Sequence, residues 1–213
     1  MKKLFLLLCI TVLAANSFAQ TEKYTKAMKS YIAELDSAFK NPPYLLDLAF
    51  KFERVATTEK NQWLPYYYAA FCQVNYTYMQ QDKSKMDVIA DSATVMLNAA
   101  DSLQPNNSEI SCVRSMIASA HMLVDPFTRY KEYGPASQIA LENAMNQDPT
   151  NPRPYLLKGQ GIRYMPENFG GGCKPALPTL QEAMDKYAAF KPASDIHPNW
   201  GKQRVEALLN ECK

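Results

Sequence analysis

Residues 151–183 read NPRPYLLKGQGIRYMPENFGGGCKPALPTLQEA and contain two helical patterns separated by one glycine-rich turn. Asn151 suits a helix N-cap, and Pro152 suits the first helical position, where its missing N–H would have no intrahelical partner. Apolar and small residues then recur at intervals of three or four on both sides of the turn: Tyr155, Gly159 and Ile162 before it, and Ala176, Leu180 and Ala183 after it. The stretch therefore predicts two antiparallel helices that pack closely.

The order of an aromatic residue, a glycine four positions later and an alanine, large apolar, alanine triad resembles the tetratricopeptide (TPR) repeat. The resemblance implies a right-handed α-solenoid built from helix hairpins. In that repeat the small residue of the first helix lies roughly twelve positions before the first alanine of the second. Here Gly159 and Ala176 are seventeen residues apart. We therefore expect about five additional residues in the turn, at PENFGGG.

Helical periodicity continues through the rest of the chain, and no stretch has a convincing strand pattern. We expect further helices at about 21–39, 44–55, 62–80, 85–103 and 107–123, and a loop that interrupts the pattern at 125–135. After this loop a sixth helix brings Leu141 and Ala144 and ends near Pro149, and a last helix begins at Pro198. The sequence thus predicts an all-α fold, a right-handed α-solenoid of TPR-like helix hairpins with about nine helices.

The N-terminus has the features of a secretory signal peptide: Lys2 and Lys3, an apolar run over residues 4–13, and small residues before Gln20. An uncleaved membrane anchor is the alternative, although the run is short for a span of about 20 residues. We expect residues 1–19 to be removed. The remaining residues 20–213 would form a single TPR-like helical repeat domain, periplasmic or secreted and not inserted in a membrane.

The charge of the mature chain excludes two classes of partner. Removal of Lys2 and Lys3 with the leader leaves 21 basic against 21 acidic residues, so the mature protein is close to neutral. Without a basic excess, neither nucleic acid nor an anionic membrane surface is expected as a partner.

Four cysteines remain after the leader, and an exported protein can pair them. Cys173 begins one predicted helix and Cys212 ends the returning one, so antiparallel packing would bring their side chains together. We predict this disulfide. Cys72 and Cys112 lie within helices among apolar neighbours, and buried thiols are favoured there over a second disulfide.

Residues suited to catalysis or metal binding are sparse. The two histidines, His121 and His197, have no second ligand at a zinc or iron spacing. The serines and cysteines show no nucleophile motif. Glycines 170–172 precede a helix and could bind an anion, but they lack the lysine and Ser/Thr of a P-loop, so a plain turn is favoured. We predict no enzyme activity, no cofactor and no metal.

Two groups of residues are candidates for a binding surface. Aromatic side chains crowd the helix expected at 62–80, and four tyrosines there could either line a concave surface or pack in the core: Tyr66, Tyr67, Tyr68 and Tyr76. The segments 125–135 and 166–173 each join the first helix of a hairpin to the second, so both should project from the same edge. We hypothesise that Arg129 and Tyr133 meet Glu167 and Phe169 there; two independent surface loops are the alternative.

Four motifs resemble a more specific group, the exported TPR-like proteins of Bacteroidetes-type bacteria. They are VDPFTRYKEYGP (124–135), DPTNPRPYLLKGQ (148–160), MPENFGGG (165–172) and FKPASDIHPNWGK (190–202). This resemblance implies a periplasmic helical repeat protein without an established activity. We predict a non-catalytic scaffold that binds an unidentified protein or peptide. The alternative is a solute-binding accessory component of a transport system.

Overall fold

In the computed structural model, residues 22–213 are described, and the predicted signal peptide lies outside them. The described residues form helices and no strand, which confirms the all-α fold class. In chain order the α-helices are residues 22–33, α2 (Leu35–Ala38), α3 (Pro42–Thr58), α4 (Trp63–Tyr78), α5 (Met86–Leu103), α6 (Ser108–Val124), α7 (Pro126–Gln147), α8 (Arg153–Tyr164), α9 (Cys173–Ala189) and α10 (Lys202–Glu211). Two short 3-10 helices, η1 (Lys83–Lys85) and η2 (Glu167–Phe169), lie in the α4–α5 and α8–α9 turns.

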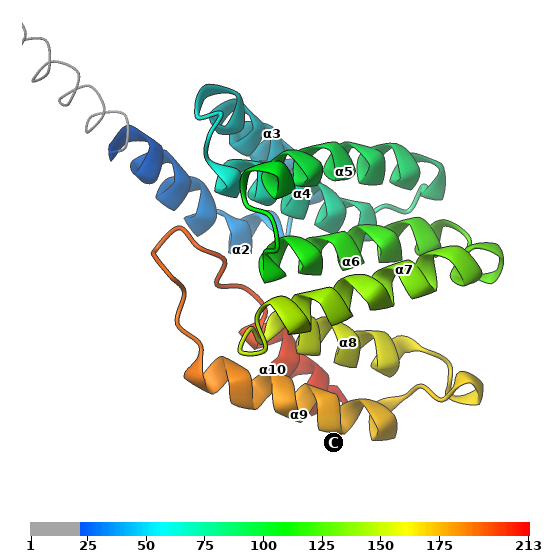
Figure 1. The fold of residues 1–213 in the computed structure, drawn as a ribbon. Coiled ribbons are helices and arrows are strands. Elements are labelled where there is room, and N and C mark those ends of the chain that lie inside the picture. Colours follow the sequence, from blue (N-terminus) through cyan, green and yellow to red (C-terminus); the bar gives the residue numbers. More distant parts are fainter. Residues whose placement is uncertain (1–21) are drawn as a thin grey trace, which may run out of the picture.

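Helices α3 to α9 form a stack in which each helix runs antiparallel to the next (Figure 1). The connections therefore fall at two ends. The α4–α5, α6–α7 and α8–α9 turns lie at one end, on the right in Figure 1, while the α5–α6 and α7–α8 turns lie at the other with segment 190–201. We call the first end the turn edge and define it as residues 78–88, 121–133 and 163–173. Stacked hairpins agree with the TPR resemblance; membership of that repeat family and the right-handed sense stay predictions.

The prediction of a loop at residues 125–135 is wrong, because this segment forms the first half of α7. Asp125 caps the helix by accepting a hydrogen bond from the Thr128 N–H, and Pro126 occupies the first helical position. Pro135 lies inside the helix, where it removes one backbone hydrogen bond without ending the helix. The hydroxyl of Ser137, half a turn further on, hydrogen-bonds two serines of α6 and holds α7 against that helix.

The last helix begins later than predicted: α10 starts at Lys202, and Pro198 lies in the non-helical segment 190–201. The Pro198 carbonyl oxygen accepts a hydrogen bond from the fully buried Arg153 (2.7 Å) rather than from a helical N–H, and this bond holds the segment in place. The same guanidinium donates to Glu109 of α6 (2.9 Å). Burial raises the pKa of the Glu109 carboxyl, and the Arg153 cation opposes that shift.

Small residues allow the helices to approach closely, as the pattern in 151–183 predicts. A Cβ atom added to Gly159 would lie 2.7 Å from Cδ2 of Leu180 and 3.3 Å from its backbone nitrogen, so a larger residue here would force Leu180 to shift and would push α8 away from α9. The core between α8, α9 and α10 consists of Leu156, Ala176, Leu180, Ala183, Tyr187, Val205 and Leu208. A larger cluster fills the space between α2, α3, α4, α5 and α6.

The predicted disulfide joins Cys173 at the start of α9 to Cys212 just after α10. Cys72 and Cys112 are free and buried, and burial raises the pKa of both thiols. They therefore pack as small apolar side chains.

The glycines before α9 form a turn that folds back onto α8. Gly170 and Gly172 have φ angles of 85° and 102°, which favour glycine, and the Gly172 N–H donates to the carbonyl oxygen of Ile162 (3.0 Å). Across residues 22–213, no helix combines the length and the apolar composition needed to cross a membrane.

Candidate functional site

The four tyrosines proposed as a binding surface lie in the core or against it. Tyr67 and Tyr68 are buried, and burial raises the pKa of both phenols. The Tyr67 hydroxyl donates to Glu109 (3.3 Å), and that of Tyr68 donates to a carbonyl oxygen of segment 190–201 (3.1 Å). Tyr66 and Tyr76 are half-buried and pack against the same core. The structure therefore favours core packing for this cluster.

Arg129 and Tyr133 contact α5 and α6 rather than the α8–α9 turn. The Arg129 guanidinium donates two hydrogen bonds to the two carboxylate oxygens of Asp87 (2.7 and 2.9 Å), a bidentate arrangement. The ring of Tyr133 stacks on His121, whose Nδ1 lies 2.8 Å from the same carboxylate. Arg129 lowers the pKa of Asp87 to about 2. This network fastens the α6–α7 turn to the start of α5.

Glu167 and Phe169 belong to η2 in the α8–α9 turn, where the Glu167 side chain lies beside Gly172. Within residues 22–213, no hydrogen bond, ion pair or ring contact joins this pair to Arg129 or Tyr133. The structure thus brings the two segments to the same end of the stack (Figure 1) but does not pair these four side chains.

The turn edge carries most of the large apolar side chains that are exposed in the described part of the chain. They are Tyr78, Val88, Leu123, Phe127, Tyr130, Tyr164, Met165 and Phe169. Phe127 has 90% of its surface exposed and Phe169 has 71%. Several exposed aromatic rings at one end of a molecule indicate a surface that another molecule covers.

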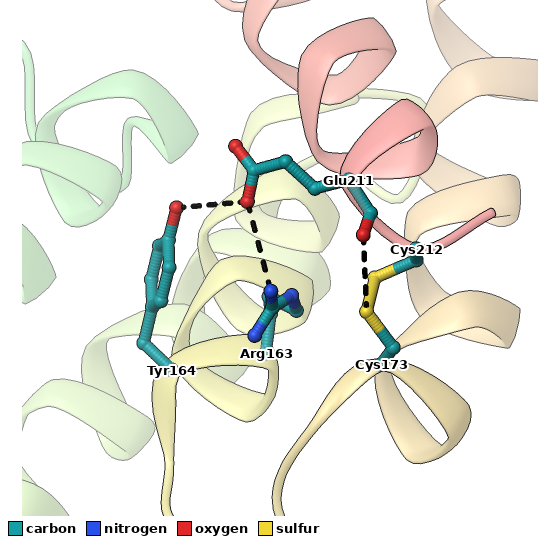
Figure 2. Close-up of a disulfide and its surroundings, with 5 residues drawn as sticks. All are labelled: Arg163, Tyr164, Cys173, Glu211 and Cys212. Carbon is teal, nitrogen blue, oxygen red and sulfur yellow. Dashed lines mark hydrogen bonds and ion pairs between the residues drawn. A yellow bond between two sulfur atoms is a disulfide. The ribbon is translucent and has the colours of Figure 1, made fainter.

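A basic cluster of Arg163 and Arg204 lies next to this apolar surface, and Figure 2 shows its Arg163 with Tyr164, Glu211 and the disulfide. The guanidinium carbons of Arg163 and Arg204 lie 5.5 and 5.7 Å from the centre of the Tyr164 ring. Arg204 donates a hydrogen bond to the Tyr164 hydroxyl (2.7 Å), which in turn donates to Glu211 (3.3 Å). The carboxylate of Glu211 also lies 3.9 Å from Arg163 and 3.6 Å from Arg204.

The disulfide determines where this carboxylate lies. Glu211 immediately precedes Cys212, so the bond to Cys173 holds the end of α10 against the start of α9 (Figure 2). The Cys173 sulfur lies 3.8 Å from the Glu211 carbonyl oxygen. This contact is not a hydrogen bond, because a sulfur in a disulfide carries no proton. Residues from α8, α9 and α10 therefore meet at one corner of the turn edge.

Metal binding by protein side chains finds little support in this geometry. Both ring nitrogens of His121 face aspartates, with Nδ1 2.8 Å from Asp87 and Nε2 3.6 Å from Asp91. His197 belongs to segment 190–201 at the other end of the stack and hydrogen-bonds Ser194. In the part of the chain that the structure describes, no group of three or more His, Cys, Asp and Glu residues could hold a metal ion.

A depression of about 360 Å³ on α3 is a weaker candidate for a ligand site. Its lining comes from α3 alone, from Phe50, Glu53, Arg54 and Thr57, and it opens widely to solvent. A ligand there would have protein on one side only. The turn edge, with contributions from three hairpins, is the better candidate.

Comparison with known proteins adds one result. No family model and no curated protein sequence matches the chain. Among solved structures, the chain is similar to the HusA haemophore from Porphyromonas gingivalis, with 38% sequence identity and a TM-score of 0.80. The similarity covers 89% of this chain and 92% of the HusA chain.

Proposed function

This chain belongs to the family of the HusA haemophore, and we propose that it is an exported, non-catalytic protein that binds haem or a related porphyrin. The observation that carries the proposal is the similarity to a haemophore along 89% of the chain. It favours the solute-binding alternative from the sequence over the protein-binding scaffold. The disulfide between Cys173 and Cys212 agrees with an oxidising compartment such as the periplasm or the cell exterior.

The turn edge is the surface of this protein best suited to a porphyrin. A porphyrin is a broad, flat and largely apolar ring, and aromatic side chains bind such a ring by stacking on its face or edge. Phe127 and Tyr130 offer exposed rings at the start of α7, and Phe169 offers another in η2. A ligand lying across these turns would cover the most exposed apolar side chains of the described residues.

The turn edge is also held in place before a ligand arrives. The bidentate bond between Arg129 and Asp87 fixes the α6–α7 turn. The disulfide of Cys173 fixes the start of α9, next to the α8–α9 turn. A surface that needs little ordering loses less conformational entropy on binding, and this favours affinity.

We expect the porphyrin ring, rather than its iron, to provide most of the binding energy. The ring nitrogens of His121 already face Asp87 and Asp91, so this histidine is not poised to ligate iron. Haemin and metal-free protoporphyrin IX should therefore bind with dissociation constants within about tenfold of each other. An affinity for haemin more than about a hundredfold higher would instead identify an iron ligand, such as exposed Tyr130.

The scaffold for a protein or peptide predicted from the TPR resemblance is the second candidate function. Exposed aromatic residues such as Phe127 suit a protein partner as well as a flat ligand. Failure of the wild-type protein to bind any porphyrin would favour this candidate.

A titration of surface variants tests the porphyrin proposal. Metal-free protoporphyrin IX is added to the mature protein and to a Phe127→Ser/Phe169→Ser variant, and binding is followed by the porphyrin absorbance. Loss of two stacking side chains should weaken binding about tenfold or more, since each aromatic contact contributes about 0.5–1.5 kcal/mol beyond its buried area.

Phe50→Ser is the matched control, because Phe50 is exposed on α3 away from the turn edge. This variant should bind as the wild-type protein does. Equal weakening by the control, or undiminished binding by the double variant, would contradict a site at the turn edge.

A further inference from the structure

We propose that Arg163 and Arg204 form a carboxylate-binding subsite beside Tyr164, which makes the protein select porphyrins with free carboxylates over their esters. The proposal rests on the proposed function and names the part of the ligand that the corner in Figure 2 recognises. Porphyrins of the haem type carry two propionate side chains, whose carboxylates are the charged groups of an otherwise apolar ring.

The corner has more positive than negative charge. Two guanidinium groups, of Arg163 and Arg204, face one carboxylate, that of Glu211. Their separations of 3.9 and 3.6 Å exceed hydrogen-bond distance, so Glu211 compensates charge without occupying the arginine donors. A second carboxylate would find both charge and donors there.

Arg163 has hydrogen-bond donors that no protein acceptor within residues 22–213 uses. In the described residues its guanidinium makes no hydrogen bond, and its Nε is buried without an acceptor. The group is instead positioned by its contact with the Tyr164 ring. A guanidinium presents paired N–H donors that match a carboxylate in two parallel hydrogen bonds.

Arg204 is held in an orientation that keeps it at this corner. Its Nε donates to Gln160 of α8 (2.8 Å), and one terminal nitrogen donates to the Tyr164 hydroxyl (2.7 Å). The other terminal nitrogen faces Glu211 at 3.6 Å. Tyr164 is half exposed between the two cations and continues into exposed Met165. The subsite is thus continuous with the apolar surface proposed for the ring.

Glu211 acts as the internal counter-ion that a ligand carboxylate meets. The Cys173–Cys212 disulfide holds Glu211 near both arginines, so its carboxylate repels an incoming anion while it balances the charge of the empty site. Removal of its charge should therefore strengthen the binding of a porphyrin with free carboxylates.

Paired ligands test the subsite with the mature, disulfide-bonded protein. Metal-free protoporphyrin IX and its dimethyl ester share the same ring and differ in the two carboxylates. The wild-type protein should bind the free acid about tenfold more tightly than the ester. The Arg163→Gln/Arg204→Gln variant should bind the free acid about tenfold more weakly and the ester unchanged, which removes the preference.

Two further variants separate this role from general charge and from folding. Lys60→Gln/Lys191→Gln removes two exposed positive charges, one in the α3–α4 turn and one in segment 190–201, and should keep the full preference. Both segments lie at the other end of the stack (Figure 1). Glu211→Gln should bind the free acid about threefold or more tightly while the ester is unaffected. Circular dichroism and thermal unfolding check that each variant is folded.

The outcomes distinguish the two proposals. If the wild-type protein binds the free acid and the ester equally, or if Glu211→Gln leaves free-acid binding unchanged, the subsite is contradicted and porphyrin binding still stands. If the wild-type protein binds neither compound, the proposed function is contradicted and the subsite with it.

Discussion

Asp87 holds the α6–α7 turn to the start of α5, because its carboxylate accepts hydrogen bonds from Arg129 of α7 and contacts His121 of α6. Its folded pKa of about 2 lies below the ordinary value of 3.8, so the charged form is bound more strongly in the folded protein. Its contribution to stability is therefore present above about pH 4 and is lost as the pH falls toward 2. The side chain is 35% exposed, and solvent screening limits the contribution to about 1 kcal/mol.

Replacement of Asp87 by Asn tests this assignment through the pH dependence of unfolding. The variant should lower the free energy of unfolding by about 1 kcal/mol at pH 7, and the difference from wild type should shrink between pH 5 and pH 2. Urea titrations across this range give the measurement. Asp91→Asn, one turn further along α5 and more exposed, should change stability by less than about 0.5 kcal/mol at every pH. A constant deficit for Asp87→Asn down to pH 2 would be inconsistent with the assignment.

Single residues also mark where prediction from sequence works and where it fails. The disulfide of Cys173 and Cys212 could be predicted because both lie at the ends of helices, and antiparallel packing brings such ends together. The corner formed by Arg163, Tyr164 and Arg204 could not be predicted. Helical periodicity does not show that Arg204, forty residues after Tyr164 in the chain, turns its side chain toward that tyrosine. The exposure of Phe127 could not be predicted either, since a pattern of apolar residues does not distinguish a buried ring from an exposed one.

At the scale of elements, α7 departs most from expectation. The dipeptide Gly134-Pro135 usually ends a helix, and the sequence around it predicts a loop. The structure continues the helix because Asp125 caps its start and Arg129 bonds Asp87. Glycine before the proline also removes the Cβ that would collide with the proline ring in helical conformation. Tertiary contacts thus overcome a local signal that favours a turn.

Pro135→Ala tests whether this segment is helical in solution. Inside a helix, alanine restores a backbone hydrogen bond and removes the steric conflict, so the variant should raise the free energy of unfolding by about 1–3 kcal/mol. Thermal and urea unfolding report the change. Pro198→Ala, in the non-helical segment 190–201, should instead lower stability by more than about 0.4–1 kcal/mol, because the unfolded chain becomes less restricted and the buried proline ring loses its packing. Destabilisation by Pro135→Ala would show that residues 125–135 are not helical.

At the scale of the whole molecule, the stack of antiparallel helices collects three turns at one end and leaves their aromatic side chains in water. The all-α class and most helix positions could be predicted from spacing alone, because small and apolar residues such as Gly159 and Leu180 recur with the helical period. The shared position of the α6–α7 and α8–α9 turns also follows from alternating helix direction. Which end binds a ligand does not follow from spacing, and neither does the ligand itself. That inference needed the exposed rings in the structure and the similarity to a haemophore.

The most direct measurement is the paramagnetic broadening of amide signals when haemin is added to isotope-labelled mature protein. High-spin ferric iron broadens the NMR signals of nearby residues, so the affected residues locate the ligand on the fold. We predict selective broadening at the turn edge, around Val88, Phe127 and Phe169, that disappears in the Phe127→Ser/Phe169→Ser variant. Broadening centred on α3 around Phe50, or none at all with haemin in excess, would contradict the binding of porphyrin at the turn edge.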